Sequence, residues 1–189
     1  MAPVLVAADG GANRALDAGL RPNAVIGDLD SISDRARAAF AEVLHHIAEQ
    51  ETTDFEKALS RIAAPAVIAL GFTGARLDHT LAVFNVLARR MDRRVILFGP
   101  EDVAFLLPAE GRLDLPAGTR LSLMPLGPSR VETRGLRWDA DGRRFDPAGH
   151  TSPSNEVVSG PVSFRAEGPV LAILPNVHLA DAIAAVRGG

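Results

Sequence analysis

The segment VIGDLDSIS, Val25 to Ser33, joins an apolar run to two aspartates that lie two residues apart. The apolar residues before Gly27 are typical of a short buried strand, and the serines that follow Asp30 are typical of a helix start. Asp28 and Asp30 therefore come directly after the end of a strand. In an extended segment their side chains would point to one side, where two adjacent carboxylates favour a bound cation.

Strands and helices alternate around this segment. The apolar pattern predicts strands at 4–8, 24–26, 45–48, 65–71 and 94–99. It predicts helices at 12–18, 33–44 and 77–90, and another that begins at Thr53. Two of the helices start with a capping-box pattern, Ser31-x-x-Asp34 and Thr53-x-x-Glu56. The alternation predicts an α/β fold, in which a doubly wound, mostly parallel sheet has helices on both faces.

One of these helices has an apolar face that can be read from its spacing. In LDHTLAVFNVLARR, at 77–90, apolar residues recur at helical intervals, and the face that we expect to be buried consists of Leu77, Leu81, Phe84 and Ala88.

The second half of the chain has a different pattern. Short apolar runs at 103–107, 119–126, 129–138, 161–167 and 169–175 are separated by Gly and Pro turns, which predicts a small all-β sandwich. We place a domain boundary near residue 100, so that the α/β domain covers 1–100 and the β-sandwich covers 101–189. Trp138 is predicted to pack in the sandwich rather than to serve as a stacking platform. HTSPSNE at 150–156 is predicted to be a polar loop that either binds a polar ligand or forms a turn. The end of the chain, NVHLADAIAAVRGG, fits a short amphipathic helix, but we favour a loosely docked tail at 177–189.

Composition excludes several classes of function. The formal net charge of −3 provides no basic field for nucleic acid. The sequence has neither a run of about 18 apolar residues for a membrane span nor a basic and then apolar leader, so we expect no membrane partner and a cytoplasmic location. The absence of cysteine excludes thiolate metal sites. Any metal must therefore be held mainly by oxygen, which indicates a hard cation such as Mg²⁺.

Further aspartates follow other predicted strands or begin helices. Asp9 comes directly after the strand at 4–8, Asp54 begins the helix that Thr53 opens, and Asp78 lies just past the strand at 65–71. The carboxyl ends of parallel strands are where open α/β sheets bind ligands. Each of these aspartates taken singly also fits a helix cap or a turn.

Two glycine-containing loops follow strands and precede helices. They are DGGAN at 9–13 and GFTGAR at 71–76, and their backbone N–H groups can hold an anion. Arg76 ends the second loop, and Lys57, the only lysine of the chain, lies one helical turn after Asp54. Carboxylates, anion-binding loops, one arginine and one lysine together favour Mg²⁺-assisted phosphoryl transfer.

These segments also form a known pattern. ADGGANRAL, IGDLDSIS, TTDFEKAL, GFTGARLDHTLAVFNVL, GLRW and SNE resemble the thiamine pyrophosphokinase family in order and approximate spacing, over roughly residues 4–175. The resemblance implies a nucleotide-binding catalytic α/β domain followed by a β-sandwich that binds thiamine and forms a homodimer with shared active sites. It also implies a reaction in which ATP donates a pyrophosphoryl group to the hydroxyl of thiamine and AMP is released.

The resemblance assigns roles to individual residues. The ligands of Mg²⁺, or their close neighbours, are Asp28, Asp30 and Asp54. Asp9 would lie near the attacking hydroxyl, and Ser154 and Asn155 would hydrogen-bond the thiamine pyrimidine. Two residues serve the phosphates, Asn13 and Lys57, and two line the nucleotide and transfer site, Arg76 and Asp78. The remaining positions expected around the nucleotide are Gly10, Gly11, Ser31, Thr53, Gly74 and His79.

The sequence departs from the family pattern in two places. Family members usually have a strand, a glycine loop and a helix before the DGGAN segment, whereas eight residues precede Asp9 in the sequence given, so we expect this first unit to be missing. An aromatic residue that stacks on thiamine commonly follows the Ser-Asn motif, whereas this chain has Val157 and Val158.

Other functions fit part of the pattern. A phosphatase or sugar transferase built on Asp-x-Asp fits GDLDSIS poorly. A pyrophosphokinase that acts on another small alcohol, such as a pterin, has closely similar chemistry. A thiamine- or nucleotide-binding module without turnover is the non-enzymatic alternative. Products formed from ATP, Mg²⁺ and thiamine would separate these alternatives.

Overall fold

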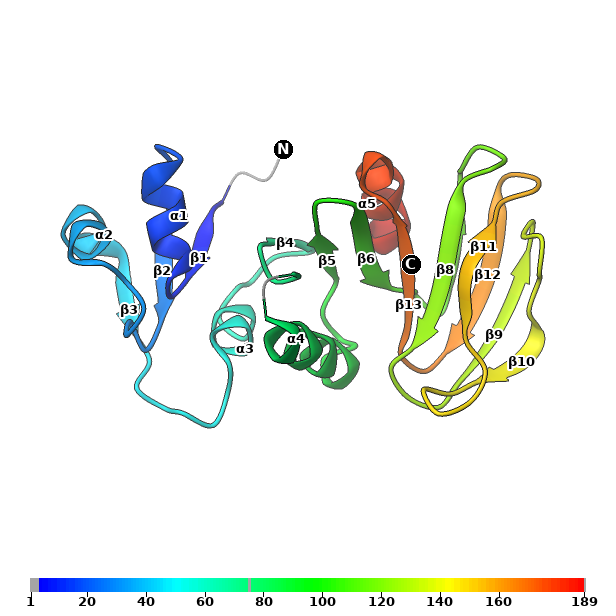
Figure 1. The fold of residues 1–189 in the computed structure, drawn as a ribbon, viewed down its shortest axis with the longest axis horizontal. Coiled ribbons are helices and arrows are strands. Elements are labelled where there is room, and N and C mark those ends of the chain that lie inside the picture. The colour runs from blue at the N-terminus through cyan, green and yellow to red at the C-terminus, as the bar shows by residue number, and fades with distance from the viewer. Residues whose placement is uncertain (1–3, 75, 189) are drawn as a thin grey trace. The chain divides into compact units, whose positions relative to one another are not determined.

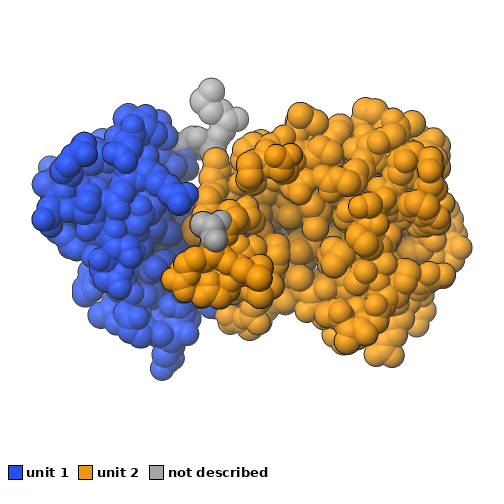
Figure 2. All heavy atoms as spheres, in the orientation of Figure 1, with its two compact units in different colours: residues 1–63 blue, residues 64–189 orange. Residues whose placement is uncertain are grey.

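The computed structural model describes residues 4–74 and 76–188. The chain divides into two compact units, residues 1–63 and residues 64–189, which we call the N-terminal and C-terminal units (Figure 2). Ala75, in the predicted loop at 71–76, lies outside the described residues. Within the described ranges no helix has the length and apolar character needed to span a membrane.

The N-terminal unit is built around a small parallel sheet (Figure 1). Its strands pair in the order β1 (Val6–Ala8), β2 (Ala24–Gly27) and β3 (Leu44–His46). The helices of this unit are α1 (Gly11–Asp17), α2 (Asp34–Ala39), the 3-10 helix η1 (Ala41–Val43) and α3 (Asp54–Leu59). Helix α3 contacts β1 and β2, while α1 contacts β1 and α2. The core of the unit includes Ala12, Val25, Leu29, Ile32 and Phe40.

The C-terminal unit contains two sheets (Figure 1). The six-stranded sheet has the order β11 (Ser152–Glu156), β8 (Arg120–Pro125), β13 (Val170–Pro175), β6 (Asp102–Leu106), β5 (Val95–Phe98) and β4 (Val67–Leu70). The four-stranded sheet has the order β10 (Asp141–Phe145), β9 (Ser129–Arg134), β12 (Val162–Glu167) and β7 (Glu110–Leu113). Its helices are α4 (Leu77–Arg89), the 3-10 helix η2 (Asn176–His178) and α5 (Leu179–Gly188).

The two sheets of the C-terminal unit share one core. Phe105 and Leu121 from the six-stranded sheet and Val131, Phe145 and Phe164 from the four-stranded sheet belong to a single buried cluster. Strand β9 shows the alternation that such packing requires, because its buried and exposed residues follow one another strictly. The predicted fold class, mostly parallel strands with helices followed by an antiparallel all-β sandwich, is confirmed.

The strands on either side of residue 100 belong to the same sheet. β4 and β5 are parallel, but β5 pairs antiparallel with β6, with Ile96 opposite Phe105. The last two parallel strands therefore continue into the six-stranded sheet of the sandwich. The compact units divide between Ala63 and Ala64, and the domain boundary near residue 100 stays a prediction.

Hydroxyl side chains begin two helices of the N-terminal unit. Thr53 caps α3, as predicted, since its Oγ1 accepts a hydrogen bond from the Glu56 N–H at 3.3 Å. The predicted capping box at Ser31 is wrong, because α2 is capped by Ser33, whose Oγ accepts from the Ala36 N–H at 3.2 Å. Ser31 therefore lies before the helix, in the loop that carries Asp28 and Asp30.

The predicted buried face of α4 is wrong. Leu77 and Leu81 are exposed. The buried residues of the helix are Val83, Val86 and Leu87. Apolar residues occur nearly all round this helix, so their spacing fits more than one face, and only the tertiary packing of the helix selects between them.

The predicted tail and the predicted polar loop both form regular structure. Helix α5 buries Ala182, Ala185 and Val186 in the core of the sandwich, so the prediction of a loosely docked tail is wrong for its described residues. Small side chains allow this helix to lie close to the strands. Most of the predicted loop at 150–156 is strand β11, at the edge of the six-stranded sheet, where polar side chains can face solvent.

Candidate functional site

Three carboxylates meet at one edge of the parallel sheet in the N-terminal unit. Asp9 follows β1 and Asp28 follows β2, and the two strands run side by side in the same direction. The Asp9 N–H donates to the Ile26 carbonyl at 2.9 Å, which extends the strand pairing to Asp9 itself. Asp9, Asp28 and Asp30 each present one carboxylate oxygen, and these three oxygens lie within 4.8 Å of one another.

Leu29 makes the turn that places Asp30 beside Asp28. Its φ of +62° lies in the left-handed region, so the segment is a turn and the extended geometry predicted from the sequence is wrong. A left-handed leucine costs on the order of 1–2 kcal/mol. Burial of its side chain and a hydrogen bond from Arg37 Nη2 to its carbonyl at 2.6 Å hold it there. Nothing in a leucine signals this conformation from sequence.

Asp9 is the most deeply buried acid of the group. It is 4% exposed, and its φ of +40° is also left-handed. Among the described residues its Oδ1 is buried and has no hydrogen-bond partner. A buried carboxylate oxygen without a partner is costly, and a cation held by the three carboxylates would satisfy it. The donors are all oxygen, so the site fits the Mg²⁺ ion expected from the sequence.

Gly27 allows the acids to approach one another. A Cβ added at this position would lie 2.7 Å from the Cβ of Asp9 and 3.1 Å from Oδ1 of Asp54. Any side chain here would therefore push Asp9 and Asp54 away from the strand end. This close approach explains the glycine in the GDLDS motif.

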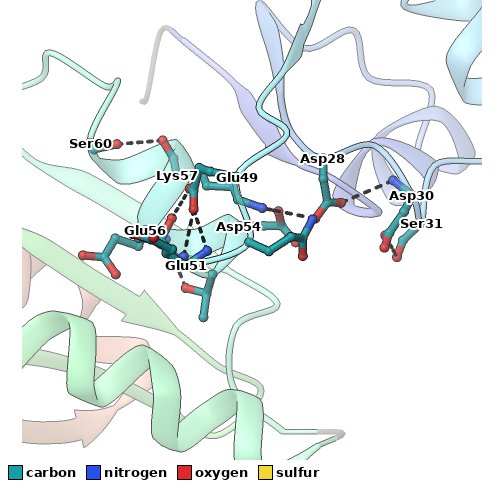
Figure 3. A network of polar contacts seen from close by, with 12 residues as sticks. Asp28, Asp30, Ser31, Glu49, Glu51, Asp54, Glu56, Lys57 and Ser60 are labelled. Atoms are coloured by element: carbon teal, nitrogen blue, oxygen red, sulfur yellow. Dashed lines mark hydrogen bonds and ion pairs between the residues drawn. The ribbon is translucent and has the colours of Figure 1, made fainter.

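Lys57 lies between two carboxylates (Figure 3). Its side chain is 2% exposed, and Nζ donates to Asp28 Oδ2 at 3.1 Å and to Asp54 Oδ1 at 3.4 Å. Burial alone would lower the pKa of Lys57, but the hydrogen bond to Asp28 and the charges of both acids outweigh it and raise this pKa. The only lysine of the chain therefore acts as a fixed positive charge inside the acid group.

Gln50 is a contact that the sequence did not predict. From the loop between β3 and α3 its Nε2 donates to Asp28 Oδ2 at 2.9 Å, and the Asp30 N–H approaches the other oxygen, Oδ1, at 3.4 Å. Hydrogen bonds from Gln50 and then from Lys57 hold the pKa of Asp28 below its ordinary value. Asp28 is thus kept ionised and held from both oxygens.

Asp54 lies next to the group of three and is not one of them. Removal of its carboxylate from water raises its pKa, the charge of Lys57 opposes this, and the negative charges of Asp28 and Asp9 add to it. The group of three consists of Asp9, Asp28 and Asp30, and the role of Asp54 as a Mg²⁺ ligand or a close neighbour stays a prediction.

Asn13 ties helix α1 to the loop of the paired acids. Its Nδ2 donates to the Ser31 carbonyl at 2.9 Å, and its Oδ1 accepts the Ser33 N–H at 2.9 Å. Gly10 lies against the same loop, since an added Cβ would be 3.3 Å from that of Ser31. Gly11 is the first residue of α1. In this structure Asn13 positions the loop, and a contact with phosphate stays a prediction.

Four predicted nucleotide residues belong to the C-terminal unit. Arg76 and Asp78 form an exposed ion pair, with Arg76 Nη2 2.6 Å from Asp78 Oδ2. The hydrogen bond from Arg76 lowers the pKa of Asp78 to about 2. The His79 N–H donates to Asp78 Oδ1 at 2.9 Å, and the Gly74 carbonyl accepts from Thr80 Oγ1 at 3.3 Å.

The predicted thiamine residues lie on edge strand β11. Ser154 is exposed and has a left-handed φ of +53°, and its N–H donates to Ser122 Oγ at 2.9 Å. Asn155 is buried, and its amide contacts the backbone of Trp138. The pairing of β11 with β8 is irregular between Ser152 and Asn155, where the left-handed residue lies.

Comparison with known families and proteins gives one consistent relationship. A family model described as "Thiamin pyrophosphokinase, catalytic domain" matches residues 1–98, and one described as "Thiamin pyrophosphokinase, vitamin B1 binding domain" matches residues 110–171. Thiamine pyrophosphokinase 3 of Oryza sativa subsp. japonica is 30% identical over 191 residues, which cover 82% of this chain and 72% of the rice protein. Thiamine pyrophosphokinase 1 of the same plant is 29% identical over 201 residues, covering 88% and 76%.

Solved structures agree in fold. Thiamin pyrophosphokinase from Geobacillus thermodenitrificans superposes with a TM-score of 0.77 at 24% identity, covering 93% of this chain and 87% of that chain. Thiamin pyrophosphokinase from Candida albicans has a TM-score of 0.77 at 16% identity, covering 92% and 82%. At these identities the likeness concerns the fold.

Proposed function

Since the chain belongs to the thiamin pyrophosphokinase family, its function is that of a thiamine pyrophosphokinase, and we propose that ATP is its donor. The pyrophosphoryl group passes to the hydroxyl of thiamine, and the products are thiamine diphosphate and AMP. The observation that carries the proposal is the group of Asp9, Asp28 and Asp30, in which a buried carboxylate oxygen lacks a partner among the described residues. Transfer from a polyphosphate requires a cation, and this group offers its ligands.

We assign Asp28 and Asp30 to Mg²⁺, with Asp9 as the third ligand and Asp54 as their neighbour. The bound ion would neutralise charge on the phosphate chain and make the transferred phosphorus more electrophilic. The thiamine hydroxyl loses its proton as the new O–P bond forms. The family resemblance suggests Asp9 as the acceptor, and a carboxylate with two oxygens can serve as both ligand and proton acceptor.

The surrounding residues hold this arrangement ready. Lys57 offsets the repulsion between Asp28 and Asp54, and Gln50 fixes the orientation of Asp28. Asn13 fixes the loop that carries Asp30. Carboxylates that are already in place need little reorganisation when the charged donor arrives, which is the main source of catalysis in phosphoryl transfer.

The remaining assignments come from the family resemblance. We propose Arg76, Asp78, Gly74 and His79 for the nucleotide, Ser154 for the thiamine pyrimidine, and a homodimer in which the sandwich of one subunit completes the site of the other. Light scattering at assay concentration tests the last point. An active monomer would contradict the shared site.

Incubation with ATP, Mg²⁺ and thiamine, followed by identification of both products, tests the function. We expect thiamine diphosphate and AMP in equal amounts. ADP with thiamine monophosphate, or free phosphate without a thiamine product, would overturn the proposal. A parallel reaction with a pterin alcohol tests the alternative acceptor, and faster AMP release from that reaction would replace thiamine as the substrate.

A further inference from the structure

The exposed face of the four-stranded sheet carries charged side chains from neighbouring strands. Strand β9 is the clearest case, because its buried residues alternate with the exposed Arg130, Glu132 and Arg134. Residues that pair across antiparallel strands lie on the same face, with their Cβ atoms about 4.5–5.5 Å apart. The register of β9, β12 and β7 therefore determines which of these charges are neighbours.

One row of residues across this face pairs a cation with acids. Arg165 of β12 lies opposite Glu132 of β9 on one side and opposite Glu110 of β7 on the other. Its Nη2 donates to Glu110 Oε2 at 3.4 Å. The cation in the middle of this row is thus flanked by an acid on each side, and opposite charges on paired strands stabilise a sheet.

The next row, two residues along each strand, contains two cations and no acid. Ser163 of β12 lies opposite Arg134 of β9 and opposite Arg112 of β7. We call these three residues the arginine row. Two guanidinium groups therefore flank one hydroxyl group. Within residues 4–74 and 76–188, Arg112 has neither a hydrogen-bond partner nor an ion-pair partner, so its charge is not compensated there.

Arg134 is partly engaged and keeps donors for a ligand. Its Nη1 donates to the Thr133 carbonyl at 2.7 Å and to the carboxylate of Asp141. A guanidinium group carries five N–H donors, so those on Nε and Nη2 remain after these two contacts with described residues. Such donors form a planar fork that matches the spacing of phosphate oxygens.

The arginine row lines a cavity of about 540 Å³. The three charged side chains of the neighbouring row, Glu110, Glu132 and Arg165, belong to the same wall. A volume of this size lies within the range of small-molecule sites. All residues that line the cavity belong to the C-terminal unit, whereas the group of three carboxylates belongs to the N-terminal unit.

We propose that Arg112, Ser163 and Arg134 bind a phosphate group, either free phosphate or the phosphate of a small monoester. Strands β9 and β7 lie on either side of β12, about 10 Å apart, so the two long arginine side chains can converge over Ser163. A phosphate dianion has about two negative charges and three terminal oxygens, which match two guanidinium groups and one hydroxyl. A carboxylate has one charge and two oxygens, so a single guanidinium satisfies it.

Isothermal titration calorimetry of the full chain with inorganic phosphate, without Mg²⁺ or nucleotide, measures this binding. We expect saturable binding to the parent and a Kd about tenfold higher in Arg112→Gln, which removes one charge-assisted contact. Arg112→Lys keeps the charge and loses the fork, so its Kd should lie between the two. Ser163→Ala removes only the hydroxyl and should also raise the Kd. Absence of saturable binding to the parent would overturn the proposal.

Arg130→Gln is the matched control, because it removes the same charge from the same face of β9 outside the arginine row. Its Kd for phosphate should equal that of the parent. Equal losses in Arg112→Gln and Arg130→Gln would show general attraction to basic groups and overturn the site.

Two further ligands identify the chemistry of the anion. Glycerol phosphate, a small phosphate monoester, is titrated into the parent and into Arg112→Gln. Tighter binding than that of inorganic phosphate, weakened in Arg112→Gln, would support a monoester as the ligand, and weaker binding would support free phosphate. Acetate that binds the parent as tightly as phosphate does would overturn the choice of phosphate.

Discussion

Asp9 and Asn155 are both buried polar residues in motifs of the family, and they differ in what their side chains contact. Asp9 lies in a group of three carboxylates, and among the described residues its Oδ1 has no hydrogen-bond partner. Asn155 makes four hydrogen bonds, all to protein atoms. An unmet buried group indicates a ligand that is to be bound, whereas a fully bonded group indicates a part of the scaffold. Two buried polar residues, each in a motif of the family, can therefore have different roles.

Backbone strain does not distinguish the two regions. Left-handed residues other than glycine occur at Asp9 and Leu29 near the acids and at Ser154 beside Asn155. Each such residue costs about 1–3 kcal/mol and persists only where its surroundings hold it. Both regions are thus built with strain, and the difference lies in their polar contacts. Under the proposed function the acids bind a cation, while Asn155 holds the backbone of Trp138.

Asp30→Asn is expected to have the largest effect on the acid group. The change keeps the shape of the side chain and removes one anionic ligand. Loss of a residue that only supports a metal ligand lowers affinity or activity by about 10–100-fold, so loss of a ligand itself should lower turnover by more than about 100-fold. Product formation at rising Mg²⁺ concentrations measures this. Asp34→Asn, the same substitution in the exposed first turn of α2, is the control. Near-parental turnover of Asp30→Asn at saturating Mg²⁺ would remove Asp30 from the metal site.

We expect substitutions at Asp9 and at Asn155 to change the free energy of unfolding in opposite directions, and this tests the difference between the two residues. Asn155→Ala removes four hydrogen bonds of a buried side chain and leaves part-buried backbone groups at Trp138 without this partner, so the free energy of unfolding should fall by about 2 kcal/mol. Asp9→Asn removes one of three crowded negative charges, so without Mg²⁺ the free energy of unfolding should rise by about 1 kcal/mol, while activity is lost. Urea unfolding followed by circular dichroism measures both.

Addition of Mg²⁺ sharpens this test. An ion that binds only the folded protein stabilises it, so the parent should gain more stability from Mg²⁺ than Asp9→Asn does. Asn155→Ala should gain as much as the parent, because its site is unchanged. A fall in the stability of Asp9→Asn without Mg²⁺ would mean that the carboxylate of Asp9 is already satisfied.

Gln50→Met is expected to have a smaller effect. It removes the hydrogen bond that orients Asp28 and keeps the length of the side chain. Support of this kind changes metal affinity by roughly tenfold, so the Mg²⁺ concentration for half-maximal turnover should rise by about that factor, with the maximal rate largely kept. Glu51→Gln, an exposed neighbour in the same loop, is the control. An unchanged Mg²⁺ dependence in Gln50→Met would show that Lys57 alone orients Asp28.

The strand ends and the start of α3 were predictable from the sequence because each has a local cause. A short apolar run followed by aspartate places Asp9 and Asp28 at strand ends, and parallel pairing then brings them together. Thr53 and Glu56 follow the preference of hydroxyl residues for helix starts. Such patterns depend on a few neighbouring residues, so they can be interpreted without knowledge of the tertiary fold.

Other features depend on packing and have no local signal. The left-handed turn at Leu29 is held by burial of the leucine side chain. Gln50 donates a hydrogen bond to Asp28, although the two residues lie 22 positions apart in the chain. The position of Asp9 beside the end of β2 follows from the register of β1 and β2. Trp138 is 61% exposed, so the prediction that it packs in the sandwich is wrong, and nothing in the neighbouring residues signals this exposure. A single sequence gives the residue types in each case and leaves their partners open.

The smallest effect is expected at the ion pair of Arg76 and Asp78, which is exposed on both sides. The hydrogen bond from Arg76 lowers the pKa of Asp78 from its ordinary 3.8 to about 2. A group with a lowered pKa in the folded state contributes stability above its ordinary pKa and loses it as the pH falls. Any difference in melting temperature between the parent and Asp78→Asn should therefore be present at neutral pH and vanish as the pH falls from about 4 towards 2. Solvent screens exposed pairs, so this difference should be small and should shrink further in high salt. A loss of stability in Asp78→Asn as large as that in Asn155→Ala would show instead that Asp78 helps to hold the fold. Asp78 would then resemble Asn155, and an acid predicted to bind a ligand would be part of the scaffold.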